Sequence, residues 1–545
     1  MDVDEILRSL GKYGRYQNLQ FAYNVFCLPM ITYPVVIYVF IGYIPDFICK
    51  VPTEYPKYYT QPDSWENATL SSRQCDVIIE INRSGLVTQE SIPCSDGYEY
   101  FGPATVASEW NLVCGSEGLG SLSTTMTVVG GILGATLFPA LTDKYGRLLI
   151  AYTTFFALSV CFILASVVPW FTAFVILRFL TGVFSQGSGL AFATLALELF
   201  PAESRGFIVS LASIMWALAI SSIAPVAFLL RYVSWRYTML AAGLIGAHSL
   251  GTRWILQESL RWLVANGKYE EAKEWIKRAA KWNKKDASDI LAAMTSANGE
   301  VQVLVETDTD VNRLQSDDKK PGKINKDPRD LEKLSILDIF RNRHILLTSI
   351  LVWIIWFVNS ITYYGLFLTS GSMSGNMYLN FFFNGIVEIP SVFLYIFTIN
   401  RYGRKKTCVM FHAIAGVSLS ISAILLFAGD TPVMKGFASA MSFAGKFGIS
   451  GSFMTIFLYT PEIYPTNLRA LGLGLASTVA RLGGMISPYA ALFGSHISWG
   501  PGVVFGSLSV LVTILFLWLP ETTGKELPDT LDDVDHFYVI KKNKK

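Results

Sequence analysis

DKYGR at residues 143–147 recurs as NRYGR at residues 400–404, and ELFPAESRG at 198–206 recurs as EIYPTNLRA at 462–470. The members of each pair are separated by almost the same length of chain. Each copy directly follows a long apolar segment. The sequence therefore predicts two related halves, with corresponding helices that end at corresponding charged turns.

The composition indicates that a lipid bilayer surrounds most of the chain. Of its 545 residues 52% are hydrophobic and only 16% are charged, whereas soluble domains carry about 25% charged residues. A helix needs about 20 apolar residues to cross the hydrocarbon layer. Segments that qualify lie near 21–47, 119–141, 148–169, 172–198, 206–230, 238–256, 344–369, 378–399, 407–428, 434–460, 470–494 and 502–520. We predict an all-α membrane protein of twelve transmembrane helices, six in each half.

This pattern divides the chain into four parts. The N-terminal six-helix half spans 1–256 and includes a long loop at 48–118, and a linker at 257–343 follows it. The C-terminal half spans 344–520, and a tail occupies 521–545. The linker segment GKYEEAKEWIKRAAKWNKK has helical spacing, whereas the stretch from 295 to 330 is polar and expected to be flexible.

Lysine and arginine in the short loops set the expected orientation. Lys144, Arg147, Arg404 and Lys405 follow the second and eighth helices, and cytoplasmic loops are enriched in such residues. We expect both termini and the linker on the cytoplasmic side, and the loop 48–118 outside.

The outer loop has the features of an oxidising, glycosylated compartment. It holds two glycosylation sequons, at Asn67 and Asn82, and an even set of cysteines. The cysteines are Cys49, Cys75, Cys94 and Cys114. Any of three disulfide connectivities remains open. These features predict a glycoprotein of the plasma membrane.

Several function classes find no support in the sequence. The net charge of +2 gives no indication of nucleic-acid binding. There is no nucleotide-binding loop, metal-spaced His/Cys cluster or nucleophile elbow. We therefore expect no enzyme, no metal and no cofactor. The expected partners are a small organic solute and membrane lipid, with a coupling ion, sodium or proton, left open. Duplicated halves are typical of secondary transporters, which bind substrate between them near the membrane midplane.

Asp143, Lys144, Gly146 and Arg147 match the motif GxxxD-[RK]-x-G-R, although Pro139 replaces its leading glycine. In this the chain resembles the major facilitator superfamily. Further motifs resemble the family of organic cation, anion and zwitterion transporters over nearly the whole length. They are SEWNLVC at 108–114, ESLRWL at 258–263, GKFGIS at 445–450 and PETTGKELPDT at 520–530. The resemblance implies the twelve-helix fold and a carrier function.

Charged groups at the helix ends are candidates for a conformational latch, since an acid and a base there can hold the halves in one state. The candidates are Asp143, Arg147, Arg404, Glu198, Arg205, Glu462 and Arg469.

Three charges near mid-span, at similar depth, form the candidate substrate site: Glu388, Lys446 and Arg481. Charged residues inside a membrane are costly and default to functional hypotheses. Glu388 could receive a substrate ammonium or pair internally with Lys446 or Arg481, and for Lys446 we favour a local ion pair. Arg481 can bind a carboxylate bidentately. The resemblance adds that cation-selective relatives carry Asp at position 481. Together with Glu388, this resembles the carnitine and zwitterion branch best.

Aromatic residues complete the predicted site, because aromatic faces attract ammonium groups. The candidates are Tyr363, Tyr364, Phe381 and Phe457. Arg178, which resembles an arginine shared across the superfamily, is interpreted as structural.

The sequence thus predicts a secondary transporter that moves a small organic zwitterion or cation, carnitine-like, across the plasma membrane by alternating access, as a symporter. Two alternatives remain. One is an organic anion exchanger, which Arg481 also permits. The other is a non-transporting membrane sensor that signals through the 257–343 linker.

Overall fold

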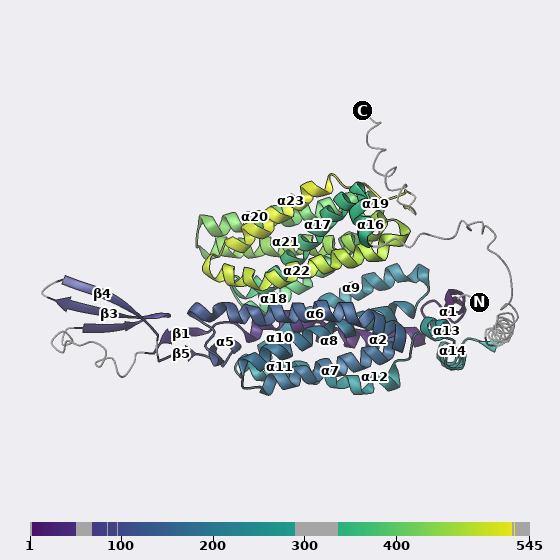
Figure 1. Cartoon of the computed structure of the whole chain (residues 1–545), viewed down its shortest axis with the longest axis horizontal. Coiled ribbons are helices and arrows are strands. Elements are labelled where there is room, and N and C mark those ends of the chain that lie inside the picture. Colours follow the sequence, from purple (N-terminus) through teal and green to yellow (C-terminus); the bar gives the residue numbers. More distant parts are fainter. Residues whose placement is uncertain are drawn as a thin grey trace, which may run out of the picture.

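The computed structural model describes residues 3–50, 68–83, 86–94, 96–288 and 336–525, together with 291 and 528. Long helices form a bundle, with β-strands projecting from one end and short helices capping the other (Figure 1). We call these the strand end and the linker end. The strand end carries β1 (Asp46–Cys49) and β5 (Tyr98–Phe101), and the linker end carries α13 (Leu260–Ala265) and α14 (Tyr269–Asn283).

The N-terminal half contains both straight and interrupted helices. Its first span is broken into α2 (Arg15–Phe26), α3 (Leu28–Val36) and α4 (Tyr38–Ile41). Proline cannot donate the helical hydrogen bond, and Pro34 lies inside α3. The other elements are α6 (Glu117–Tyr145), α7 (Arg147–Val167), α8 (Phe171–Glu198), α9 (Arg205–Ser221) with α10 (Ile223–Leu229), and α11 (Trp235–Ile245) with α12 (Ser249–Ile255).

The C-terminal half repeats this order after α16 (Ile336–Arg341). Its spans are α17 (Arg343–Leu368), α18 (Met377–Ile386) with α19 (Glu388–Tyr402), α20 (Arg404–Ala428), α21 (Pro432–Ile463), α22 (Arg469–His496) and α23 (Gly500–Phe516). In the described parts of the chain, six spans thus follow the linker and six precede it, as predicted. The first span differs, because α4 ends at Ile41 and the chain has already turned into β1 by Asp46.

Among the described residues, nine of these spans are long and apolar enough to cross a membrane. Each of the other three spans differs from a long, continuous, apolar helix in one property. A 3-10 turn (Gly246–His248) divides α11 from α12, α23 has 17 residues, and α21 is long but rich in glycine, serine and threonine. Small residues of this kind permit close helix packing in membranes.

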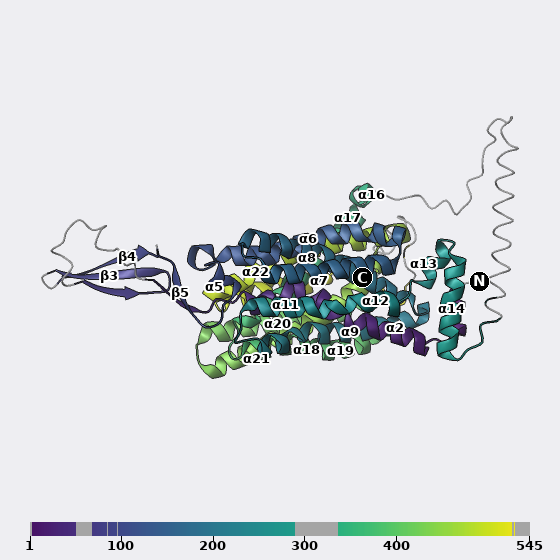
Figure 2. The ribbon, with the colours of Figure 1, turned by 90° about the horizontal axis from the view of Figure 1, so that it is seen from below.

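Close backbone packing fixes the pair α6 and α8. A Cβ atom at Gly182 would lie 1.8 Å from the carbonyl oxygen of Thr127, and one at Gly130 would lie 2.0 Å from that of Phe179. No larger side chain can replace these glycines without separating the helices. The two halves lie side by side along the bundle, with α22 of one next to α6 of the other (Figures 1 and 2).

The contacts that join α6 to α22 run from mid-span to the strand end. Thr125 donates a hydrogen bond to the carbonyl oxygen of Met485, 3.0 Å away, and Ser121 donates one to that of Pro488. At the strand end, His496 lies 3.6 Å from the Glu117 carboxylate. The halves therefore meet at the strand end in this conformation.

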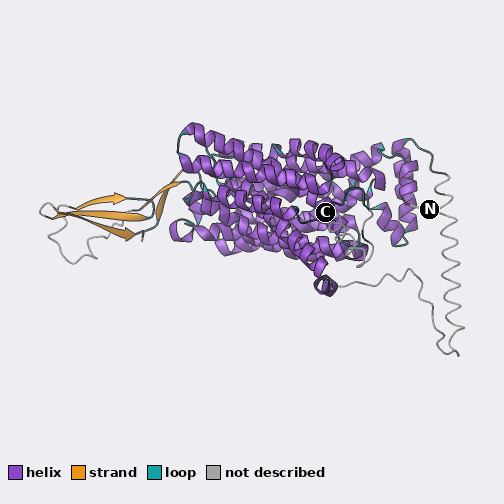
Figure 3. Ribbon diagram, turned by 90° about the horizontal axis from the view of Figure 1, so that it is seen from above, coloured by secondary structure: helices purple, strands orange, loops and turns teal. Residues whose placement is uncertain are grey.

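The strand end contains two antiparallel sheets, which the sequence analysis did not predict (Figure 3). One pairs β1 with β5, and the other has the order β2 (Ala68–Ser72), β3 (Asp76–Arg83), β4 (Leu86–Pro93). The predicted cysteines form two disulfides, Cys49–Cys94 and Cys75–Cys114, which resolves the open connectivity. Asn82 lies in β3, whereas Asn67 lies outside the described residues. Glycosylation of both stays a prediction.

At the linker end α14 presents an apolar face of Ala272, Trp275, Ile276, Ala279 and Ala280 to the start of the chain. The ring of Tyr16 packs edge-on against Trp275, and Asn283 accepts a hydrogen bond from the Tyr16 backbone. The linker helix therefore belongs to the N-terminal half. The stretch expected to be flexible, 295–330, lies outside the described residues.

The repeated motif has the same geometry in both halves. Gly146 and Gly403 have φ values of 105° and 90°, a left-handed region that glycine adopts without strain. A distant glutamate then accepts backbone N–H groups of the next helix. Glu258 accepts those of Arg147 and Leu148 at the start of α7. Glu521 accepts that of Arg404, 2.9 Å away, at the start of α20.

We predict that Glu258→Ala lowers the thermal unfolding midpoint of the purified protein. The substitution leaves the first N–H groups of α7 without their acceptor, at a cost of about 1–3 kcal/mol. Glu271→Ala, in the exposed ion pair with Lys268 on α14, should change the midpoint little. Equal midpoints for the two variants would show that the Glu258 cap contributes no stability.

Candidate functional site

A buried ion pair lies in the middle of the C-terminal half. The Lys446 ammonium is 3.0 Å from the Glu388 carboxylate, and the two residues are 0% and 6% exposed. Glu388 is the first residue of α19, where the eighth span is interrupted, and Lys446 lies within α21. The internal pairing that the sequence left open is thus present in this conformation.

The same ammonium lies against two aromatic rings. Its nitrogen is 3.2 Å from the centroid of Tyr363 and 3.8 Å from that of Phe367. An organic ammonium ion binds favourably in a protein to an aromatic face and a carboxylate. Here a cation of the chain itself occupies that environment, which we call the ammonium cage: Tyr363, Phe367 and Glu388.

The cage is connected to the other half. The indole N–H of Trp216, on α9, donates to the Tyr363 hydroxyl over 3.2 Å. The rings of Tyr364 and Phe453 lie 5.2 and 5.3 Å from that of Tyr363. Tyr363 therefore takes part in both the ion-pair environment and the contact between halves.

Arg481 spans the two halves near the cage. Its guanidinium donates to the side-chain oxygen of Gln186 on α8, 3.1 Å away. Tyr364 packs against the same helix as Arg481, since a Cβ atom at Gly484 would lie 3.7 Å from its ring. Close packing of α22 on α17 positions this part of the helix, since a Cβ at Gly483 would lie 2.5 Å from the carbonyl oxygen of Phe357. The hydrogen bond that the structure shows for Arg481 goes to an amide, not to a carboxylate.

The remaining predicted aromatic residues lie in different surroundings. Phe381 is fully buried and packs between Phe40 and Phe367, with ring centroids 4.9 and 5.1 Å away. It closes the strand-end side of the cage as part of the core. Phe457 is half exposed and stacks edge-on with Trp356 at 4.6 Å. It lies toward the linker end, eleven residues beyond Lys446 along α21.

Among the described residues, the ion pairs formed by the predicted latch charges each lie within one half in this conformation, and a latch between the halves stays a prediction. Arg147 pairs with Asp143 and with Glu198, at 3.1 and 3.3 Å. Arg404 pairs with Glu462 at 3.1 Å. Each pair belongs to a single half, because both partners flank helices that pack within it.

In the described part of the chain, the two other predicted latch cations, Arg469 and Arg205, do not pair with the acids expected for them. Arg469 donates to the carbonyl oxygens of Tyr464 and Pro528 rather than to Glu462. The structure pairs Glu198 with Arg147 and not with Arg205. The motif arginines that follow Gly146 and Gly403 therefore take the acids at the ends of α8 and α21.

Burial and hydrogen bonding set the pKa values of acids at the linker end. Burial raises the pKa of Glu258, although backbone N–H groups of Ser259, Leu148 and Arg147 oppose the shift. For Glu521 burial acts in the same direction, but bonds from Thr523, Lys405 and Arg404 outweigh it and lower the pKa. The hydrogen bond from Arg261 lowers the pKa of Asp4.

Three site residues were not found from the sequence: Trp216, Gln186 and Phe367. Gln186 is a polar residue in an otherwise apolar helix, which is a usable signal. Trp216 and Phe367 carry no such signal among the many aromatic residues of the membrane spans. Their roles depend on helix rotation, which the sequence does not show.

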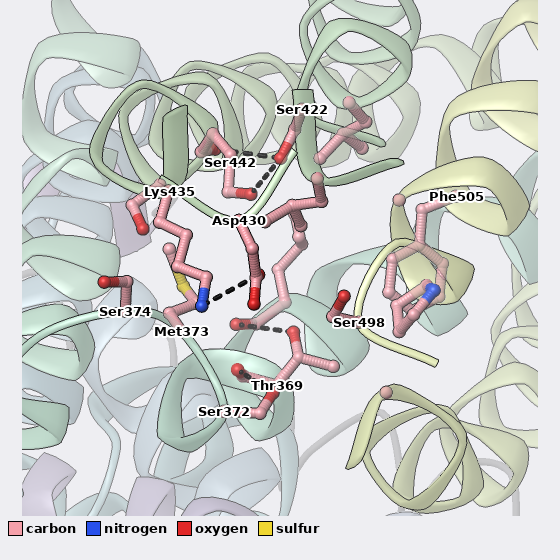
Figure 4. A pocket seen from close by; sticks show the side chains of 18 residues that line it. Thr369, Ser372, Met373, Ser374, Ser422, Asp430, Lys435, Ser442, Ser498 and Phe505 are labelled. Carbon is pink, nitrogen blue, oxygen red and sulfur yellow. Dashed lines mark hydrogen bonds and ion pairs between the residues drawn. The ribbon is translucent and has the colours of Figure 1, made fainter. Parts of the chain in front are cut away.

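A separate cavity of about 260 Å³ opens within the C-terminal half (Figure 4). Hydroxyl groups of Thr369, Ser422 and Ser442 line it, and the Asp430–Lys435 ion pair, 2.8 Å long, lies beside them. Its residues come from the strand-end parts of α17, α20, α21, α22 and α23 and from the turns between these helices, so it does not lie between the halves.

Comparisons with known proteins agree with this architecture. Residues 98–488 match the family model described as Major Facilitator Superfamily. The fold is similar to that of the xylose transporter XylE from E. coli in a partially occluded inward open conformation. The TM-score is 0.59 and the identity 16%, over 94% of this chain and all of that one. The chain is therefore a multi-pass membrane transporter of the major facilitator superfamily, not an enzyme.

Sequence relatives define the family more narrowly. The chain is 31% identical to the "Organic cation transporter protein" of Drosophila melanogaster, over 98% of this chain and 95% of the relative. It is 29% identical to "Solute carrier family 22 member 7" of Rattus norvegicus, over 98% of both chains. It belongs to this family of organic cation and anion transporters.

We predict that Glu388→Ala destabilises the protein more than the double variant Glu388→Leu/Lys446→Met. Removing one partner leaves a buried, uncompensated charge, at a cost of about 3–5 kcal/mol. An apolar pair of similar volume carries no such cost. The measurement is the unfolding midpoint together with the yield of monodisperse protein, and a double variant less stable than Glu388→Ala would contradict the prediction.

Proposed function

We propose that this transporter carries small organic ions that bear a carboxylate, with a carnitine-like zwitterion as the leading substrate class. The observation that carries the proposal is the position of Arg481 between the halves, hydrogen-bonded to the Gln186 amide. An arginine binds a carboxylate through two parallel hydrogen bonds. The hydrogen bond to Gln186 uses one N–H donor of this guanidinium and leaves others for a carboxylate.

The balance of charge supports a substrate with a negative group. Lys446 and Glu388 neutralise each other within the cage, so Arg481 leaves the cluster of three with one net positive charge. A simple organic cation would meet that charge without a free carboxylate to compensate it. A carboxylate on the solute removes the imbalance.

For a zwitterion the ammonium group has a defined place. It would lie at the ammonium cage and share Glu388 and the ring of Tyr363 with Lys446. The ring of Tyr364 lies 5.2 Å from that of Tyr363 and packs against α22 at Gly484, and we infer that one small solute spans from the cage to Arg481. Binding would then replace the Arg481–Gln186 hydrogen bond and loosen a contact between the halves.

An organic anion exchanger is the second candidate. It is favoured by the same ion pair, because a Glu388 already neutralised by Lys446 needs no ammonium from the solute. The two candidates differ in whether Glu388 takes part in transport.

Alternating access follows from where the halves touch. The contacts Thr125–Met485 and Ser121–Pro488 close the strand end in this conformation. We infer that they break when the site opens toward that end. With the lysine- and arginine-rich linker end in the cytoplasm, the strand end faces the outside of the plasma membrane.

We predict that Arg481→Asp reduces carnitine uptake by at least about thirtyfold, because the loss of a buried charge pair costs about 2 kcal/mol or more. Uptake of labelled carnitine is measured in cells, with the amount of surface protein determined for each variant. Lys435→Gln, in an exposed ion pair, is the matched control. Wild-type uptake by Arg481→Asp would remove the assignment.

We predict further that Glu388→Gln separates the two candidates. Per molecule of surface protein, it should reduce uptake of a zwitterion severalfold more than uptake of an aromatic anion. The amount of surface protein itself should fall, because Lys446 loses its counter-charge. Equal effects on both solutes would exclude Glu388 as an ammonium contact and favour the anion exchanger. The absence of accumulation of any solute in a panel of zwitterions, cations and anions would instead favour the sensor.

A further inference from the structure

Arg178, on α8, is a second membrane arginine that the proposed transport site does not use. Its side chain is completely buried. In the part of the chain that the structure describes, its Nε, Nη1 and Nη2 atoms all lack a hydrogen-bond partner. The linker-end arginines Arg147 and Arg404, by contrast, each pair with a glutamate.

The described membrane helices of its half offer Arg178 no carboxylate partner. The membrane helices from α6 to α12 carry acids only at their ends, at Glu117, Asp143 and Glu198, and α2 to α4 carry none. Two of these acids pair with Arg147 and the third lies beside His496. The guanidinium thus has no acid to pair with at its depth in the membrane.

The surroundings of Arg178 hold hydroxyl groups. The Tyr38 hydroxyl, from α4, packs against α6 at Gly120, where a Cβ atom would lie 2.3 Å from it, and it interacts with the guanidinium. The Ser123 hydroxyl donates to the carbonyl oxygen of Gly120, 2.9 Å away. Gly182 on α8 packs tightly against Thr127 on α6. One helical turn nearer the strand end, Arg178 on α8 therefore lies at the same level as Ser123 and Thr124 on α6. The Thr124 hydroxyl is also buried and without a partner.

A cation in such a place needs a counter-charge. Arginine does not lose its proton in proteins, and a buried charge without compensation costs several kcal/mol. The guanidinium N–H groups can only donate, and the buried Thr124 hydroxyl has a donor without a partner, so a small acceptor with negative charge would satisfy both and neutralise the guanidinium. The close approach of α6 and α8 leaves no room for a large organic ion.

We propose that Arg178 binds a small inorganic anion of halide size, together with the hydroxyls of Tyr38 and Thr124. This site lies within the N-terminal half, between α4, α6 and α8. It is therefore separate from Arg481, which lies between the halves, and its occupancy does not depend on the substrate proposed above.

The experiment compares thermal unfolding midpoints of the purified full-length protein in sodium chloride and in sodium gluconate at matched ionic strength. A ligand that binds the folded state raises the midpoint in proportion to the logarithm of its concentration above the dissociation constant. We expect the wild-type midpoint to rise by several degrees in chloride. Equal midpoints in the two salts would overturn the proposal.

Variants assign the effect to a residue. Arg178→Gln should abolish the chloride dependence, and its midpoint in gluconate should equal or exceed that of the wild type, because the uncompensated charge is gone. Arg481→Gln, the matched control, should keep the full dependence. A dependence that survives in Arg178→Gln and disappears in Arg481→Gln would place the anion at the transport site and overturn the proposal.

A second pair of measurements applies even where Arg178→Gln does not fold. Thr124→Val should raise the half-saturating chloride concentration severalfold, because one donor is lost while the volume is kept. Crystals grown in bromide should show an anomalous scattering peak beside the Arg178 guanidinium. An unchanged half-saturating concentration combined with no bromide peak there would refute the site.

Discussion

The ion pair between Lys446 and Glu388 is the interaction on which the architecture of the C-terminal half depends. Two opposite charges lie 3.0 Å apart where almost no solvent reaches them. Such a pair is tolerated only when each charge has its partner. It therefore fixes the rotation of α19 against α21, and with it the placement of Tyr363 and Phe367 around the ammonium. The proposed substrate site is built on this arrangement.

The connection between the halves is of a different kind. It consists of single hydrogen bonds, such as Trp216 to Tyr363 and Arg481 to Gln186, and of hydroxyl-to-carbonyl contacts along α6 and α22. Each contributes about 1 kcal/mol, so they can break and reform singly. Within a half, in contrast, glycine contacts such as that of Gly182 with Thr127 leave the packed helices no freedom to shift against each other. Stiff halves with a weakly bonded interface are what a rocking carrier requires.

The linker-end charges show how the repeat stabilises each half. The sequence located them correctly at the helix ends, yet the structure assigns them to partners inside one half. Glu258 and Glu521 cap helices far from them in the sequence, a role that the motif alone does not reveal. A positive φ at Gly146 and Gly403 brings the chain back sharply enough for one distant carboxylate to reach two N–H groups.

The sequence by itself determined the number and approximate bounds of the membrane spans, the duplication, the residues that carry charge at mid-depth and the four cysteines of the loop. These follow from hydropathy and spacing, which are local properties of the chain. The tertiary structure decided which partners within the chain those residues have: Lys446 at Glu388, Gln186 at Arg481, and Cys94 rather than Cys75 or Cys114 at Cys49. Such pairings depend on the rotation and depth of helices and strands distant in sequence, and no local pattern encodes these.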